Sequence, residues 1–101
     1  MSEDHERSSG SGGNFPLSAR QWGHQSPRMG LSRRQAQMVP GIFEDKTELA
    51  IGLALGISEG TVHMHMDELR RKLDVLSRAA VVACVMRGYI RMQREDGGAG
   101  M

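Results

Sequence analysis

The side chains best suited to chemistry in this chain lie between positions 58 and 72. His63 and His65 are the first candidates for a metal pair, but residues two apart on a helix diverge by about 200° and cannot share an ion. The sequence shows no Ser-His-Asp set, no paired carboxylates of a catalytic cleft and no Gly-rich phosphate loop. We therefore expect neither an enzyme nor a bound metal or cofactor.

Phosphate binding fits the same segment better. Ser58 can cap a helix whose first backbone N–H groups take a DNA phosphate, and Thr61 can donate its hydroxyl to another. Gly60 removes side-chain bulk where such a helix would enter a groove. A basic cluster follows at Arg70-Arg71-Lys72. Because the net charge is only +1, the prediction depends on where the charges cluster and not on their total.

The elements that would position these residues are helices. Apolar residues make up 39% of the 101 residues and aromatic residues only 4%, which suits one small all-α domain. Ser32 and Gln35 can form the capping box of a first helix, which Pro40 is expected to kink or end early. Thr47 caps a second helix, in which Gly52 permits the close approach of a neighbour.

The third helix is predicted from about Ser58 to Leu73, after the turn Gly56-Ile57-Ser58. Its apolar stripe recurs at i, i+4, i+7 and i+11 as Val62, Met66, Leu69 and Leu73. Two short helices joined by such a turn make a helix-turn-helix. The outer face presents Gly60, Met64, Asp67 and Arg71, flanked by His63 on one side and by His65, Glu68 and Lys72 on the other. Such a face can read a DNA groove, although similar charges also occur on surfaces that are merely solvated.

Asp67 lies on this outer face in line with Met64 and Arg71. A carboxylate there either accepts a hydrogen bond from a cytosine amino group or repels the DNA backbone. We favour repulsion because Asp is too short to reach base edges well. Arg71, four residues on, could hold Asp67 in an ion pair.

A fourth helix is predicted from Ser77 to about Tyr89. Its run from Ala79 to Met86 is apolar on every side, whereas a domain this small covers only one side. We therefore expect a homodimer through this helix, with contacts from Val81, Cys84 and Val85. Cys84 is the single cysteine, which excludes an internal disulfide, and we expect a buried, unreactive thiol.

Both ends of the chain are predicted to be disordered tails. Residues 1–29 are rich in Gly and Ser, are interrupted by prolines and show no apolar period. Phe15, Leu17 and Trp22 are the exceptions, and we interpret them as passive, with a short partner-binding motif as the alternative. Residues 95–101 form the second tail.

A resemblance to the LuxR-type helix-turn-helix is carried by Leu31-Ser32-Arg33-Arg34-Gln35 and by Leu55-Gly56-Ile57-Ser58-Glu59-Gly60-Thr61-Val62. It continues where that family has a His, an aliphatic residue, a Lys-Leu pair, a Val and a Ser-Arg, at His65, Leu69, Lys72, Leu73, Val75, Ser77 and Arg78. The resemblance implies a four-helix LuxR-type DNA-binding domain over 30–94, with its third helix in the major groove and its fourth often forming a homodimer. It also implies sequence-specific control of transcription.

The resemblance also assigns roles by position. It makes His63, Met64 and Asp67 base-facing residues, and Thr61, His65 and Lys72 contacts or supports at the DNA backbone. The chain departs from the family where His63 replaces a usual lysine and Gln35 a usual glutamate. The predicted DNA-binding residues are Ser58, Glu59, Thr61, His63, Met64, His65, Asp67, Arg70, Arg71 and Lys72.

The predicted function is thus a DNA-binding transcription regulator whose partners are double-stranded DNA and a second copy of itself. RNA polymerase or a regulatory protein is a further candidate partner. No signal peptide and no apolar run of ~20 residues is visible, so we expect a cytoplasmic protein that does not enter a membrane. The alternative is a protein-interaction module of the same fold without useful DNA binding, motivated by Asp67 and His63 on the reading face. A sigma-factor fragment is a third hypothesis, against which the match at Lys72-Leu73 and Ser77-Arg78 argues.

Overall fold

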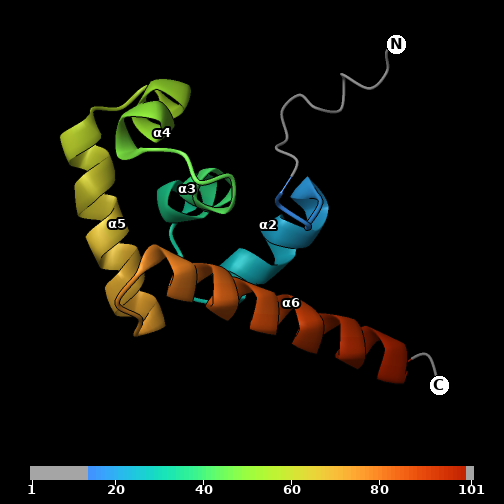
Figure 1. Cartoon of the computed structure of the whole chain (residues 1–101). Coiled ribbons are helices and arrows are strands. Elements are labelled where there is room, and N and C mark those ends of the chain that lie inside the picture. Colours follow the sequence, from blue (N-terminus) through green and yellow to red (C-terminus); the bar gives the residue numbers. More distant parts are fainter. Residues whose placement is uncertain (1–13, 100–101) are drawn as a thin grey trace, which may run out of the picture.

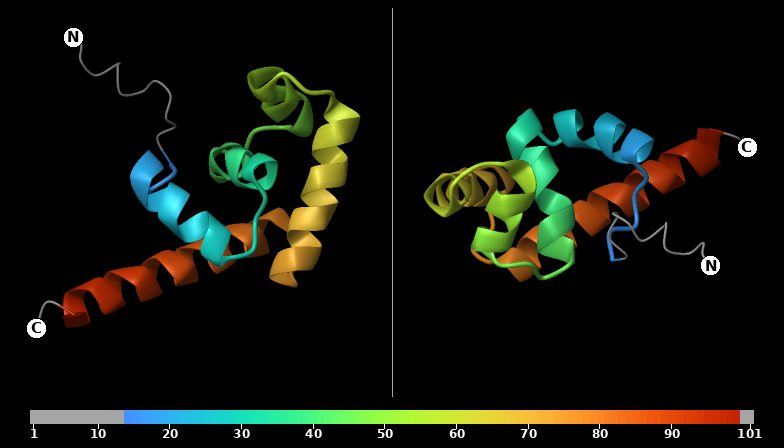
Figure 2. Two further views of the ribbon diagram at one scale, coloured as in Figure 1. Left: turned by 180° about the vertical axis from the view of Figure 1, so that it is seen from behind. Right: turned by 90° about the horizontal axis from the view of Figure 1, so that it is seen from above.

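The computed structural model describes residues 14–99, with side chains as far as residue 95. This part of the chain contains five helices and no strand: α2 (Ala19–Arg28), α3 (Arg33–Phe43), α4 (Glu48–Leu55), α5 (Glu59–Leu73) and α6 (Arg78–Ala99). The predicted all-α class is confirmed, with one helix more than expected. In Figure 1, α3 lies at the centre, α4 and α5 lie on one side of it and α2 on the other. The long α6 packs across α2, α3 and α5, as the further views in Figure 2 also show.

The four predicted helices begin where the sequence places them. Ser32 accepts a hydrogen bond from the N–H of Gln35 at 3.1 Å, and the Gln35 side chain accepts one from the N–H of Ser32 at 2.9 Å. Thr47 and Ser58 cap α4 and α5 in the same way, and Ser77 does so at the start of α6. Each cap satisfies a first-turn N–H that has no partner within its own helix. None of the described helices is both long and apolar enough to cross a bilayer.

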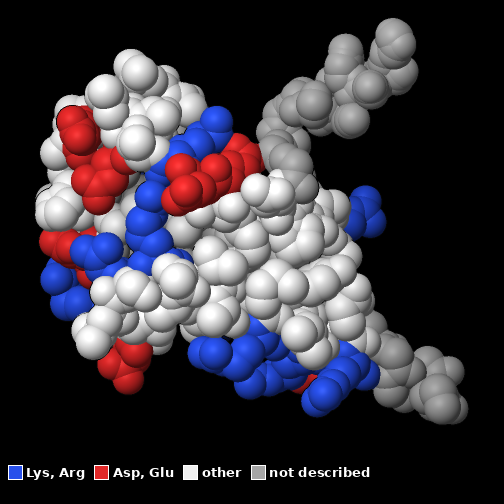
Figure 3. Space-filling model, viewed as in Figure 1, with Lys and Arg blue, Asp and Glu red and all other residues white. Residues whose placement is uncertain are grey.

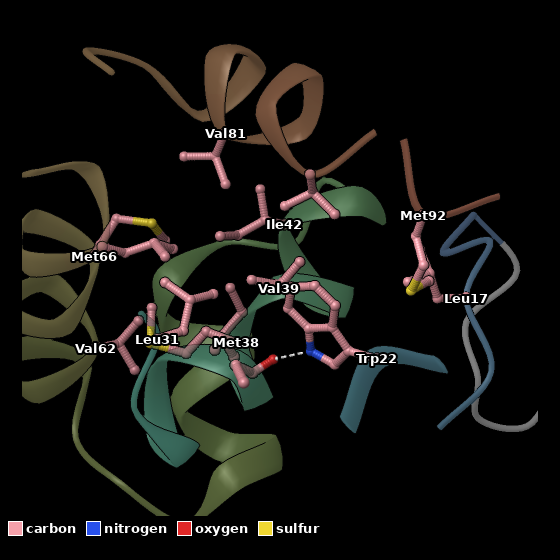
Figure 4. Close-up of a cluster of buried hydrophobic side chains, with 14 residues drawn as sticks. Leu17, Trp22, Leu31, Met38, Val39, Ile42, Val62, Met66, Val81 and Met92 are labelled. Atoms are coloured by element: carbon pink, nitrogen blue, oxygen red, sulfur yellow. Dashed lines mark hydrogen bonds between the residues drawn. The ribbon is translucent and has the colours of Figure 1, made fainter. Parts of the chain in front are cut away.

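Pro40 lies inside α3 and does not end it. The helix continues to Phe43, so of the expected kink or early end, the early end is wrong. A proline has no N–H, and the carbonyl of Ala36, four residues earlier, therefore loses its helical partner. The indole Nε1–H of Trp22 donates to that oxygen at 2.8 Å in a buried position, as Figure 4 shows. A side chain of α2 thus replaces the hydrogen bond that the proline removes from α3.

Trp22 belongs to a helix that the sequence analysis missed. The prediction of disorder over 1–29 is wrong for the described residues from 14 onward, because α2 forms and packs into the core; residues 1–13 lie outside the described part. Trp22 is only 8% exposed and Leu17 6%. The ring of Phe15 meets those of Trp22 and Phe43 edge-on, with centroids 5.4 and 5.0 Å apart. These residues are core, and neither a passive tail nor an exposed motif.

The last helix, α6, is longer than predicted. It reaches Ala99, so the prediction of a disordered segment over 95–101 is wrong as far as residue 99; residues 100 and 101 lie outside the described part. Met92 is 8% exposed and lies beside Leu17 in the core, as Figure 4 shows. The N-terminal segment that was predicted to be a tail therefore packs against the second half of α6.

A glycine lets α2 approach α6 closely. A Cβ at Gly88 would lie 2.7 Å from Nε2 of Gln25. That amide nitrogen donates to the carbonyl oxygen of Val85 at 3.2 Å, in a buried position. Gly88, which we expected to stand near the end of the last helix, instead makes room within it for a side chain of α2.

Candidate nucleic-acid interface

A close contact at Gly52 fixes α4 against α5. A Cβ at this position would lie 2.6 Å from the carbonyl oxygen of Ile57 and 3.3 Å from a methyl group of Val62. Neither neighbour can move away easily, because the Ile57 oxygen belongs to the backbone of the turn and Val62 is fully buried in α5. The predicted reason for a small residue at this position is confirmed, and the contact fixes how α5 leaves the turn.

Helix α5 has one buried side and one exposed side. Of the predicted stripe, Val62, Met66 and Leu69 are 0% exposed, whereas Leu73 is only partly buried against the core. On the opposite side Gly60 and Arg71 are exposed, and Met64 is 50% exposed. The amphipathic division expected from the sequence is therefore present, with an apolar side chain at the middle of the outer face.

The first turn of α5 can receive an anion. Ser58 accepts a hydrogen bond from the N–H of Thr61 at 3.1 Å, and its hydroxyl donates to Oγ1 of Thr61 at 2.9 Å. Thr61 keeps its own hydroxyl hydrogen for another acceptor. The N–H groups of Glu59 and Gly60 have no partner within the helix and lie at the positive end of its dipole. Two amides and one hydroxyl are thus free to bind a phosphate oxygen.

His63 lies between two carboxylates that come from different helices. Its Nδ1 is 3.2 Å from Oε1 of Glu48, at the start of α4, and its Nε2 is 3.7 Å from Oδ2 of Asp67. Asp67 accepts a hydrogen bond from Arg70, and not from Arg71 as the sequence suggested. A row of polar contacts, from Glu48 through His63 to Asp67, therefore joins α4 to α5 at the outer face of α5. Within the residues whose side chains are described, no three His, Cys, Asp or Glu side chains are grouped to hold a metal ion.

The other flank of α5 is fastened to the helices behind it. Oε1 of Glu68 accepts a hydrogen bond from the buried Gln35 at 3.2 Å. Nζ of Lys72 donates to the carbonyl oxygen of Gly30 at 2.8 Å. The His65 side chain is 22% exposed, and its Nδ1 lies 3.4 Å from the Glu68 carboxylate. Of the predicted site residues, His65 and Lys72 therefore stand at the edge of the reading face and hold α5 in place.

The charges of α5 cancel. The helix carries three carboxylates and three cations, namely Glu59, Asp67 and Glu68 against Arg70, Arg71 and Lys72. Figure 3 shows acidic and basic side chains intermixed over the side of the molecule formed by α4 and α5. The predicted basic cluster Arg70-Arg71-Lys72 exists, but Asp67 already binds Arg70, so the outer face of α5 has little net positive charge.

Glu48 is the side chain of this face that the sequence analysis missed. It follows the cap Thr47, where a carboxylate stabilises the start of a helix for a local reason. Its position in the first turn of α4 is enough to explain a carboxylate there, and the sequence alone does not indicate that His63 of α5 lies beside it. Only the packing of α4 on α5 reveals the contact.

Helices α4 and α5 are joined by a tight turn and pack closely at Gly52, and α5 is buried on one side and polar on the other. This arrangement defines a helix-turn-helix protein. A family model described as bacterial regulatory proteins of the luxR family matches residues 29–85, more than half of the chain. The chain belongs to that family, as its sequence suggested. Fold and family together make it a helix-turn-helix DNA-binding transcription regulator.

The chain is also similar to the regulatory protein SdiA of Escherichia coli (strain K12). The two are 32% identical over 59 residues, which cover 58% of this chain and 24% of SdiA. The chain thus spans about a quarter of the length of that relative. No solved structure matches the chain.

Proposed function

We propose that the protein controls transcription by placing α5 in the major groove of a specific duplex site. The observation that carries the proposal is the division of α5, whose inner side is buried while Gly60, Met64 and Arg71 stand exposed. The major groove is about 12 Å wide and admits a helix that is free on one side. The open amides of Glu59 and Gly60 would bind a phosphate at the groove edge. Such a regulator would act in the cytoplasm, with the chromosome.

Placement within α5 supports a division of labour. Met64 can make an apolar contact with a thymine methyl group, and Arg71 can bind guanine or a phosphate. His63 lies beside them and is 60% exposed, although Glu48 already holds it. His65 and Lys72 support the helix from its edge, because both are engaged with neighbouring elements.

Asp67 provides the test of this arrangement. Its carboxylate is 40% exposed on the reading face, so a DNA backbone would meet a negative charge there. Asp67→Asn removes that charge, keeps the shape and releases Arg70 for a phosphate. We expect tighter binding to every duplex by a similar factor, measured by fluorescence anisotropy on a selected site and on scrambled duplexes.

Asp45→Asn is the matched control. It removes the same charge from a side chain that is 98% exposed in the α3–α4 connection, and Asn tolerates the φ of 59° found there. Affinity should change little in this variant. If Asp67→Asn abolished selectivity at one base pair, Asp67 would be a base-reading residue. If it left affinity at the level of the control, α5 would lie outside the groove and the proposal would lose its support.

We also propose a homodimer through α6, made by other contacts than the Val81, Cys84 and Val85 expected from the sequence. Val81 and Val85 are 0% exposed in the core of the single chain, so the expectation that they contact a partner is wrong. The outward side of α6 carries a different apolar stripe with the i, i+4, i+7, i+11 spacing of an interhelical seam: Ala79, Ala83, Met86 and Ile90. The stripe ends at Ile90, which is 48% exposed.

Charge placed in this stripe should separate the dimer. Ile90→Glu is expected to give a monomer by sedimentation at concentrations where the wild type is dimeric. Leu53→Glu on α4 is the control, because it also replaces an exposed apolar residue, 76% exposed, but lies away from α6. Wild type that stays monomeric at high micromolar concentration, with and without DNA, would refute the dimer.

A protein-interaction module of the same fold is the second candidate function. Two observations favour it: the cancelled charge of α5, and the neighbouring side chains of Leu49 and Leu53 on α4, 53% and 76% exposed. That apolar pair would be available to RNA polymerase or to another regulatory protein. Duplex binding that is undetectable even in dilute buffer would favour this function over DNA reading.

A further inference from the structure

Cations from three helices meet at a groove on the side of the molecule crossed by α6. Arg28 ends α2, Lys72 lies in the last turn of α5, and Arg87 and Arg91 are one turn apart on α6; together they line a groove of about 400 Å³. Arg94 follows one turn later and is exposed. Figure 3 shows Lys and Arg side chains gathered along the lower edge of the molecule, over α6. We call these five residues the basic groove.

The basic groove is strongly positive, unlike the reading face. The residues that line it within the described part of the chain include no carboxylate; its apolar floor is formed by Met29, Leu73 and Cys84. The ion pair that the groove cations form among the described residues joins Arg28 to Glu95 at its rim, at 3.9 Å. Because the whole chain has a net charge of only +1, the five cations gathered here leave the rest of the chain with a formal net charge of −4.

Most of the basic groove lies outside the family domain. Arg28 precedes the matched residues 29–85, and Arg87 and Arg91 follow them. The groove exists because α2 docks on α6 through Gln25 and the close contact at Gly88. It is therefore formed mostly by residues outside the part of the chain that matches the family model.

We propose that the basic groove is a second DNA-binding surface, which holds the phosphate backbone of the duplex that α5 reads. The proposal rests on the proposed function of α5. Lys72 belongs to both surfaces, so the groove begins where the recognition helix ends. Arg87 and Arg91 are about 6 Å apart along the helix axis, and Arg94 extends their row. A row of guanidinium groups suits the repeated phosphates of a strand, each of which Arg can bind with two hydrogen bonds.

The groove also supplies what α5 lacks. Affinity for DNA comes largely from cations that neutralise phosphates, whereas the charges of α5 cancel. In this arrangement α5 supplies sequence discrimination, and the basic groove supplies attraction that is the same for every sequence.

The test measures how the affinity of the whole 101-residue chain for a selected duplex depends on salt. Each lost phosphate contact lowers the slope of log K against log salt by about 0.9. Arg87→Gln and Arg91→Gln should each lower it by about 0.9, and the double variant by about 1.8. Over a fourfold rise in salt, the wild type should then lose about 12-fold more affinity than the double variant. Preference among duplex sequences should not change.

Two controls separate charge and position from folding. Arg20→Gln removes an exposed cation at the start of α2, away from the groove, and should leave the slope unchanged. Arg87→Lys with Arg91→Lys should keep most of the slope, because the charge remains. Arg87 and Arg91 are both exposed, so thermal unfolding should be the same in all variants.

The outcomes distinguish this inference from the function on which it rests. If the wild type binds no duplex, the proposed function of α5 fails, and the inference fails with it. If the wild type binds with selectivity but the double variant has the wild-type slope, the basic groove is not a DNA surface while α5 still reads DNA. Saturable binding of pyrophosphate that Arg87→Gln abolishes, with an unchanged DNA slope, would overturn the inference in favour of a small phosphate ligand.

Discussion

The hydrogen bond from Trp22 to Ala36 predicts an unusual coupling between two substitutions. Pro40 removes the N–H that would have satisfied the Ala36 carbonyl, and the indole replaces it at 2.8 Å. Trp22→Phe keeps an aromatic ring but leaves that buried oxygen without a partner, which costs about 1–3 kcal/mol, in addition to about 1 kcal/mol for the lost volume. With Pro40→Ala already present, the new N–H at position 40 satisfies the oxygen, and only the volume cost remains.

We therefore expect Trp22→Phe to destabilise the wild type by about 2–4 kcal/mol and the Pro40→Ala background by about 1 kcal/mol. The measurement is equilibrium unfolding in urea, followed by far-ultraviolet circular dichroism, because Trp22 is the only tryptophan and its fluorescence is lost in the variant. Met92→Ala, in the part of the core shared with Leu17, is the control and should cost the same in both backgrounds. A cost of Trp22→Phe that agrees within about 0.5 kcal/mol between the two backgrounds would refute the reasoning.

Three further predictions follow from other contacts. Gly52→Ala should destabilise the protein by about 1–3 kcal/mol, because the new Cβ would lie 2.6 Å from the Ile57 carbonyl oxygen. Gly60→Ala is the comparison: its Cβ would lie 4.0 Å from Ser58 Oγ, and the variant should be more stable by up to ~1 kcal/mol, with urea unfolding measuring both. Removal of residues 1–28 should lower the melting temperature sharply, which calorimetry would show, since the Ala36 carbonyl loses its donor. Glu48→Gln should raise affinity for all duplexes, but less than Asp67→Asn does, because Glu48 is 28% exposed against 40% for Asp67; anisotropy titrations compare the two.

Helix starts were predictable because a cap acts over a few residues. Ser32, Thr47, Ser58 and Ser77 each bind an N–H three positions on, so the sequence alone contains the whole interaction. The buried stripe of α5 was predictable for a similar reason, since the helical repeat places its members on one side without any knowledge of what covers them.

Helix α2 was missed because its buried side includes polar residues. α2 buries Trp22 together with Gln25 and Ser26, so the sequence shows no apolar period to detect. One local signal was present: Ser18 and Gln21 form the same capping box as the one correctly identified at the start of α3. A capping box without an apolar stripe was interpreted as part of a tail.

The candidate site shows the same limit. The exposed positions of α5 followed from its period, but the contact of His63 with Glu48 joins residues 15 apart, and that of Lys72 with Gly30 residues 42 apart. Helix α6, the predicted fourth helix, shows most clearly that a sequence does not reveal contacts between distant residues. A run that is apolar on every side cannot indicate which side is already covered, so the sequence assigned Val81 and Val85 to a partner when the core of the same chain buries them.

The residues added around the family domain are part of its folding unit. The domain spans 29–85, yet the Ala36 carbonyl within it depends on Trp22, and the Val85 carbonyl accepts from Gln25, both outside it. Both hydrogen bonds are buried, so separating α2 from the domain would leave polar groups without partners. The basic groove, which needs α2 and the second half of α6, is for this reason held at a fixed orientation to α5. If one duplex binds both surfaces, as we propose, no further ordering of the chain is needed, and this rigidity favours simultaneous use of both surfaces over binding at either alone.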